Sequence, residues 1–182
     1  MIRSLLAALA LTAALAASAA AAPWAKPKSP VIPEASGYVV IPNAAVPPER
    51  GRLYKAIFDA TRASEKPTQL LPALDMAGSE LNAFGVAGVP AKDVRFAVVF
   101  HGPAMDGLLD EAHYRAKYKV SNPNLPVLRE LKRSGVELYV CGQNLAFEGW
   151  DRKAIAPEVT VASDALIVLM KYQSTGYALM SF

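Results

Sequence analysis

The sequence has very few residues that could cross-link the chain or bind a metal ion. It contains 182 residues but one cysteine, Cys141, so an intramolecular disulfide and a zinc site with several cysteines are excluded. Its acidic residues at positions 106, 110 and 111 fall near His113, but a charged, solvent-exposed helix face explains all four. We therefore predict no metal site.

Charged residues are also scarce, and their signs nearly balance. They form 19% of the chain, with 19 Lys and Arg against 16 Asp and Glu, which gives a net charge of +3. No basic cluster accompanies this small excess, so nucleic-acid binding is not favoured. Glycine-rich nucleotide-binding loops, C-x-x-C and the G-x-S-x-G elbow are all missing, and no cofactor is predicted.

The N-terminal residues are typical of a secretory signal peptide. Arg3 precedes an apolar run over residues 5–17, and a cluster of alanines follows. The run is shorter than the roughly 20 residues that span a membrane. We predict cleavage of residues 1–21, after Ala20 or Ala21, and a periplasmic protein without a membrane segment. The alternative is an uncleaved anchor.

The next segment, residues 22–51, is rich in proline. It holds seven of the chain's 14 prolines, which disfavour helix and favour an extended conformation. We expect an extended arm here, and we expect its apolar residues 38–41 to dock on the following domain as an edge strand.

Residues 52–182 show the alternation of an α/β domain. Apolar runs predict strands at residues 53–58, 94–100, 136–140, 160–161 and 177–180. Helical periodicity predicts helices at residues 68–84, from a cap at Asn124 onward, and at residues 162–172. Such alternation indicates a mostly parallel sheet that is covered by helices on both faces.

Two reactive side chains follow predicted strands. His101-Gly102 comes after residues 94–100, and Cys141-Gly142 comes after residues 136–140. The carboxyl ends of parallel strands share one edge of the sheet, so we expect an exposed Cys141 near His101. His101 either accepts the thiol proton or only fixes its turn. Cys141 is either reactive or simply packed.

Other polar residues near these strand ends are candidates for substrate binding. Gly102, Gly142, Gln143 and Asn144 would line the crevice around Cys141, where their backbone N–H groups can open a short helix. Asn122 is open to two interpretations. It serves turn and cap chemistry, or it projects its amide over the crevice.

These motifs resemble those of the DsrE/DsrF-like family of sulfur-relay proteins. The resemblance spans roughly residues 52–182 and rests on VVFHG (98–102), NPNLP (122–126), GVELYVCGQ (135–143) and GYA (176–178). It implies a three-layer α/β/α domain with a five-stranded sheet, assembled into trimers or hexamers. It also implies that Cys141 can carry a persulfide.

The signal peptide predicts export, which departs from the cytoplasmic members of the family. The resemblance predicts that the protein binds or carries sulfur on Cys141 and has at most a sulfur-transfer activity. Its partner would be a protein that donates or accepts sulfur, or a small sulfur compound. The apolar residues 165–170 exceed what one buried helix stripe requires, which indicates a homo-oligomer. The alternative is a non-catalytic module that binds a small ligand or has a structural role.

Overall fold

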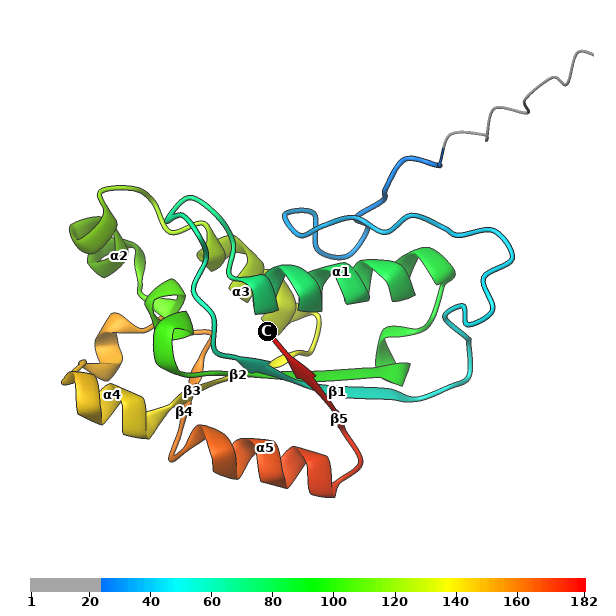
Figure 1. Ribbon diagram of the computed structural model, residues 1–182. Coiled ribbons are helices and arrows are strands. Elements are labelled where there is room, and N and C mark those ends of the chain that lie inside the picture. The colour runs from blue at the N-terminus through cyan, green and yellow to red at the C-terminus, as the bar shows by residue number, and fades with distance from the viewer. Residues whose placement is uncertain (1–23) are drawn as a thin grey trace, which may run out of the picture.

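The fold is built on a five-stranded sheet in the order β4-β3-β2-β1-β5 (Figure 1). The computed structural model describes residues 24–182, and every pairing in its sheet is parallel. The strands are β1 (Tyr54–Ala60), β2 (Val94–Phe100), β3 (Glu137–Cys141), β4 (Thr160–Ala162) and β5 (Ala178–Ser181).

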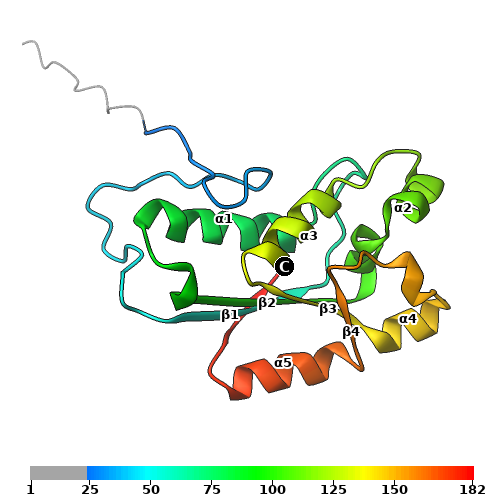
Figure 2. The ribbon, with the colours of Figure 1, turned by 180° about the vertical axis from the view of Figure 1, so that it is seen from behind.

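Helices cover both faces of this sheet, as Figures 1 and 2 show. Two helices, α1 (Pro72–Ala87) and α3 (Asn124–Arg133), lie on one face, and α5 (Ala165–Ser174) lies on the other. Two shorter helices, α2 (Glu111–Tyr118) and α4 (Gly142–Glu148), lie towards the carboxyl ends of the strands. Three 3₁₀ helices complete the chain: Ala91–Asp93, Gly102–Leu108 and Arg152–Ala154. The predicted three-layer α/β/α architecture is confirmed.

The alternation of side chains in β2 explains why helices are needed on both faces. Val98 and Phe100 belong to the core beneath α1 and α3, whereas Ala97 and Val99 pack in the cluster beneath α5. All four residues are fully buried. A central parallel strand therefore requires the nearly continuous apolar run from which this strand was predicted.

The region before α3 differs from the prediction. Asn124 is not the helix cap, because Pro123 holds that position and no side chain caps the helix. Asn124 is instead fully buried, and its Oδ1 accepts the N–H of Leu71, 2.8 Å away. Its amide thus joins the start of α1 to the start of α3, a long-range role that local sequence does not indicate.

The expected edge strand at residues 38–41 is wrong. Tyr38 forms an isolated antiparallel bridge with Lys28 of the arm itself, and the two edges of the sheet are β4 and β5. The arm lies instead across α1 (Figures 1 and 2). Ile32 of the arm is fully buried against the core.

Asn82 of α1 provides the polar part of this docking. Its Oδ1 accepts the N–H groups of Val31 and Ile32, both at 2.9 Å, and its Nδ2 donates to the carbonyls of Ile32 and Ser36. The helix surface beneath the arm is kept flat by glycine, since a Cβ at Gly78 would collide with the arm. The extended backbone of the arm therefore forms hydrogen bonds with a helix side chain rather than with a sheet edge.

The arm also places Glu34 near Glu130 of α3. Partial burial, together with the neighbouring Glu34 carboxyl, raises the pKa of Glu130 from its ordinary value of 4.5. A raised folded-state pKa favours the protonated acid, so this group costs stability once the pH rises above 4.5. We expect Glu130→Gln to stabilise the protein at pH 7 by at most about 1 kcal/mol, because Glu34 is exposed and Arg133 already pairs with Glu130.

Urea unfolding at pH 7 and pH 4 measures this difference. The gain from Glu130→Gln should disappear at pH 4, and Glu65→Gln, at an exposed loop position, should change neither curve. A Glu130→Gln variant that is no more stable than the parent at pH 7 would refute the electrostatic interpretation.

Candidate active site at the carboxyl edge of the sheet

Cys141 is the last residue of β3, at the carboxyl edge of the sheet. Its side chain is only 5% exposed and packs with Val99 and Val168 in the cluster beneath α5. The expectation of an exposed thiol is therefore wrong. The cause is the position of α5, which begins beside the strand end and covers the sulfur.

The start of α5 contributes a hydrogen-bond donor to this sulfur. The backbone N–H of Ala165 donates to Cys141 Sγ, with 3.4 Å between nitrogen and sulfur. Asp164 caps the same helix by accepting the N–H of Leu166. The sulfur therefore faces the N-terminus of a helix, where the first N–H groups carry a partial positive charge.

His101 pairs with a carboxylate that the sequence analysis missed. Its Nε2 lies 2.7 Å from Oδ1 of Asp59, and both side chains are about three-quarters buried. A carboxylate only accepts hydrogen bonds, so Nε2 carries a proton and Nδ1 of the neutral ring remains free to accept one. The sequence does offer one indication of a role for Asp59, because this acidic residue lies near the carboxyl end of an otherwise apolar strand.

The strand register brings these three residues to one edge and one face. Phe100 pairs with Val140, so His101 and Cys141 occupy adjacent positions at the ends of neighbouring strands. Asp59 pairs with Val99, which packs beneath α5 as Cys141 does. The structure thus places His101 and Cys141 at the same sheet edge, as the alternation of strands and helices predicts.

Other predicted residues join the loops around this edge. Gly142 opens α4, and a Cβ on it would collide with the Ala162 carbonyl oxygen. Asn144 accepts the N–H of Gly102 at 3.0 Å, which joins the ends of β2 and β3. Gln143 donates to the Ser163 carbonyl at 3.2 Å, which joins the ends of β3 and β4.

Asn122 has a different role, in the loop before α3. Its Nδ2 donates to the carbonyls of Gly107 and Leu109, and its Oδ1 accepts both the backbone and the side-chain N–H of Asn124. These bonds occupy the whole amide, which leaves no group for a ligand and favours the turn interpretation. His113 is exposed and pairs with Asp110 at 2.8 Å, as expected of a surface residue.

Two cavities flank α4 beside this edge. One, of about 580 Å³, is lined by Gly142, Gln143, Ala162 and Ser163 among others, but not by Cys141 itself. The second, of about 310 Å³, is lined by Gly102 and Asn144 together with residues of the neighbouring loops. Within residues 24–182, no group of three His, Cys, Asp or Glu side chains could hold a metal ion. No helix of that part of the chain is long and apolar enough to cross a membrane.

Comparison with known proteins identifies the family. A sequence model of the DsrE/DsrF-like family matches residues 55–182, so this chain belongs to that family. The match begins one residue into β1 and leaves the arm outside.

Two solved structures match this chain, and the first has a similar fold. The MTH1491 protein of unknown function from Methanobacterium thermoautotrophicum is 19% identical, with a TM-score of 0.54 over 71% of this chain and 99% of that one. The ychN protein of E. coli is 16% identical, with a TM-score of 0.49 over 71% of this chain and 100% of that one. Nothing among the curated proteins matches.

Proposed function

We propose that this protein is an exported member of the DsrE/DsrF-like family that carries sulfur as a persulfide on Cys141. The observation on which the proposal depends is the hydrogen bond from Ala165 N–H to Cys141 Sγ, at the carboxyl edge where such sheets place their reactive groups. His101 at the adjacent strand end and the cavity beside Gly142 support it.

The chemistry requires one thiolate and one proton acceptor. The Cys141 thiolate attacks the terminal sulfur of a donor persulfide, forms a new S–S bond and releases the donor as its thiolate. His101 Nδ1 takes the thiol proton before the attack, and Asp59 stabilises the resulting imidazolium. No net oxidation occurs, because the sulfane sulfur only moves from one sulfur atom to another.

The burial of Cys141 favours the alternative, a structural module in which the thiol is only packed. Access to Sγ requires displacement of the first turn of α5, where Ala165 and Val168 pack against Cys141. A carrier must make this movement, whereas a packing role does not require it. The two functions therefore differ in whether the native thiol reacts.

Intact mass spectrometry after exposure to inorganic polysulfide tests the proposal. We expect the native protein to gain the mass of one sulfur atom, to lose it with dithiothreitol, and to carry it on the peptide that contains Cys141. Protein whose thiol was alkylated after unfolding and then refolded should gain nothing. A native protein that stays at its original mass would favour the structural alternative.

The role of His101 gives a graded prediction. A histidine that accepts the thiol proton contributes about 10²-fold or more to rate, so His101→Ala should slow sulfur loading by about that factor without preventing it. Asp59→Asn should slow loading less and should shift the pH profile of the rate, because it changes the partner of the imidazole. His113→Ala, at the exposed histidine, should leave the rate unchanged. Equal rates in all three variants would remove the His101–Asp59 pair from the mechanism.

Export is the second part of the proposal. Residues 1–21, which lie outside the described residues, carry the charged start, apolar run and alanine cluster of a signal peptide. We expect protein recovered from the periplasm of a Gram-negative host to begin at Ala21 or Ala22. A product that retains Met1 in the membrane fraction would indicate an uncleaved anchor.

We further propose that the outer face of α5 forms a homo-oligomeric interface. Leu166, Ile167 and Met170 are 60%, 54% and 62% exposed, an unusual density of large apolar side chains on one helix face. Met170→Glu should therefore dissociate the oligomer in sedimentation equilibrium, whereas Lys171→Glu, at the adjacent exposed position, should not. A monomeric parent protein at micromolar concentration would contradict the interface.

A further inference from the structure

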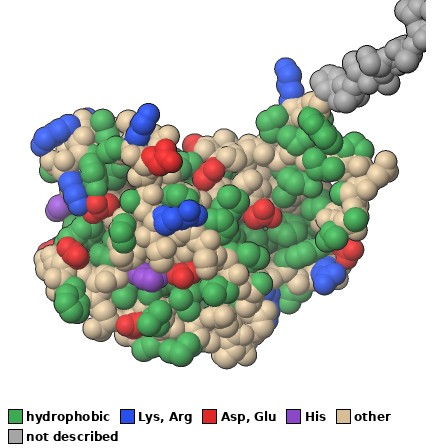
Figure 3. All heavy atoms as spheres, viewed as in Figure 1, with side chains coloured by type: hydrophobic (Ala, Val, Ile, Leu, Met, Phe, Trp, Pro, Cys, Tyr) green, Lys and Arg blue, Asp and Glu red, His purple; other side chains and the backbone are tan. Residues whose placement is uncertain are grey.

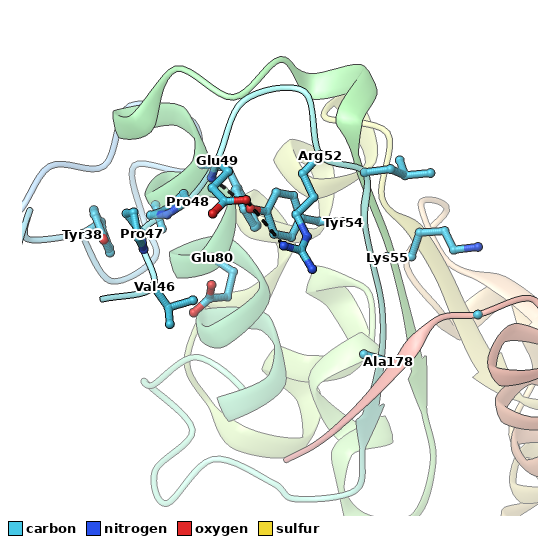
Figure 4. Close-up of a pocket in the computed structure, with 14 residues that line it drawn as sticks. Tyr38, Val46, Pro47, Pro48, Glu49, Arg52, Tyr54, Lys55, Glu80 and Ala178 are labelled. Atoms are coloured by element: carbon cyan, nitrogen blue, oxygen red, sulfur yellow. Dashed lines mark hydrogen bonds and ion pairs between the residues drawn. The ribbon is translucent and has the colours of Figure 1, made fainter. Parts of the chain in front are cut away.

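The arm and the domain together enclose a cavity at the amino end of the sheet, opposite Cys141. It measures about 570 Å³. Val46, Pro47 and Pro48 of the arm form one side, and Tyr54 of β1 and Glu80 of α1 line the domain side (Figure 4). Because the arm lies outside the region that matches the family, the arm side of this cavity is an addition to the family domain.

A second cavity continues the first along β5. It measures about 340 Å³ and shares Tyr54, Lys55, Glu80, Phe84 and Ala178 with the first. Its other lining residues are apolar: Ala56, Phe58, Met76, Phe96, Met180 and Phe182. We call the two cavities together the β5 trough. Its aromatic rings contact one another in sequence, with centroids 4.5 Å apart for Tyr54 and Phe84 and 6.1 Å apart for Phe84 and Phe96.

Little covers this trough from outside. All four residues of β5 are exposed, and β5 is an edge strand of the sheet. Figure 3 shows hydrophobic side chains gathered on the face that carries the arm and α1, with isolated charged groups among them. A recess of this volume, apolar along β5 and bordered by charged groups beside the arm, has the size and lining of a small-molecule site.

Two charged side chains, those of Lys55 and Glu80, line both cavities. Glu80 is an exposed residue of α1. Among residues 24–182 it forms no ion pair, and desolvation by its surroundings raises the pKa of its carboxyl above the ordinary value. The cations beside it have other partners. Arg52 lies 3.5 Å from Glu49, and Lys55 donates to the Thr175 carbonyl and lies over the ring of Tyr177.

We propose that the β5 trough binds a hydrophobic amine, with its ammonium group paired to Glu80 and its apolar body between α1 and β5. The charge decides the class of ligand. The Lys55 ammonium contacts the Thr175 carbonyl and the Tyr177 ring, which leaves the Glu80 carboxylate for a ligand. An ammonium placed at Glu80 would neutralise this carboxylate, a neutral molecule would gain only from apolar burial, and an anion in the same position would be repelled by it. Aromatic rings near the mouth add a favourable surface for a cation.

This site does not depend on sulfur transfer, because no residue of the Cys141 edge lines it. The trough could also be covered by a second copy of this chain. That occupant is one of the outcomes of the test below.

Isothermal titration calorimetry with three probes of equal chain length tests the proposal. Octylammonium, 1-octanol and octanoate, each below its aggregation concentration, differ only in the head group. We expect octylammonium to bind about fivefold tighter than octanol, the size of a solvent-accessible ion pair, and octanoate to bind more weakly than either. Glu80→Gln should abolish the preference for the amine over the alcohol, whereas Glu65→Gln should preserve it.

A second variant keeps the test decisive if Glu80→Gln perturbs α1. Ala178→Trp places an indole in the part that both cavities share and should abolish the binding of all three probes without changing the oligomeric state. The proposal is overturned if octylammonium fails to bind the parent or binds no better than octanol, or if its preference survives Glu80→Gln. It is also overturned if Ala178→Trp dissociates an oligomer that excludes the probes, because the trough would then be an interface.

Discussion

Replacing Asn82 with alanine should release the arm from α1 while the α/β domain stays folded. The amide is fully buried and makes four hydrogen bonds to arm backbone. Their loss would leave buried N–H and carbonyl groups without partners, at a cost of about 2–3 kcal/mol in docking. Hydrogen exchange of the Val31 and Ile32 amides should then accelerate by roughly 30- to 150-fold, while the amides of β2 stay protected.

A second variant separates this effect from general loss of arm contacts. Ser36 also bonds to α1, through Asp75, but that contact is exposed. Ser36→Ala should therefore change exchange at Ile32 by less than about fivefold. If Asn82→Ala leaves the arm as protected as in the parent, docking depends on Ile32 and the glycine surface of α1 rather than on the buried amide.

Cys141→Ser should abolish sulfur loading completely, because the hydroxyl cannot form a stable bond to sulfane sulfur. The fold should survive, since serine is smaller and its oxygen can accept the Ala165 N–H that now donates to sulfur. We expect a loss of about 1 kcal/mol in urea unfolding and an unchanged circular dichroism spectrum.

The comparison of loading with stability makes this variant informative. If Cys141 were only structural, Cys141→Ser would lower the stability, but the parent protein would show no sulfur loading for the variant to lose. Residual loading of Cys141→Ser at the parental rate would show that the sulfur is held elsewhere. The sole-cysteine sequence makes that outcome easy to detect.

The sheet was predictable because its strands are specified locally. Residues 94–100 are nearly all apolar, which predicts a strand that is buried on both faces. Gly102 follows His101 and Gly142 follows Cys141, which predicts a turn at the end of each strand. Parallel order then placed His101 and Cys141 together without knowledge of any contact. The ends of the helices shifted by a few residues, as at Pro72, whose ring suits a first helical turn.

The burial of Cys141 and the partners of the arm were not predictable in this way. Whether a strand-end side chain is covered depends on where the next helix begins, and α5 begins at Ala165, 24 residues beyond Cys141. The arm's partners are separated from it by about 50 residues, as in the bond from Ile32 to Asn82. The role of Asp59 depends on the pairing of β1 with β2, which brings its carboxylate to His101.

The most direct test of the central claim is the quantity of transferable sulfur on the loaded protein. Cyanide removes sulfane sulfur as thiocyanate and restores the thiolate, so the thiocyanate released counts the persulfides present. After exposure to polysulfide and desalting, the native protein should release one equivalent of thiocyanate per chain, and Cys141→Ser should release none. No thiocyanate from the native protein, or an equal amount from both proteins, would contradict a persulfide on Cys141.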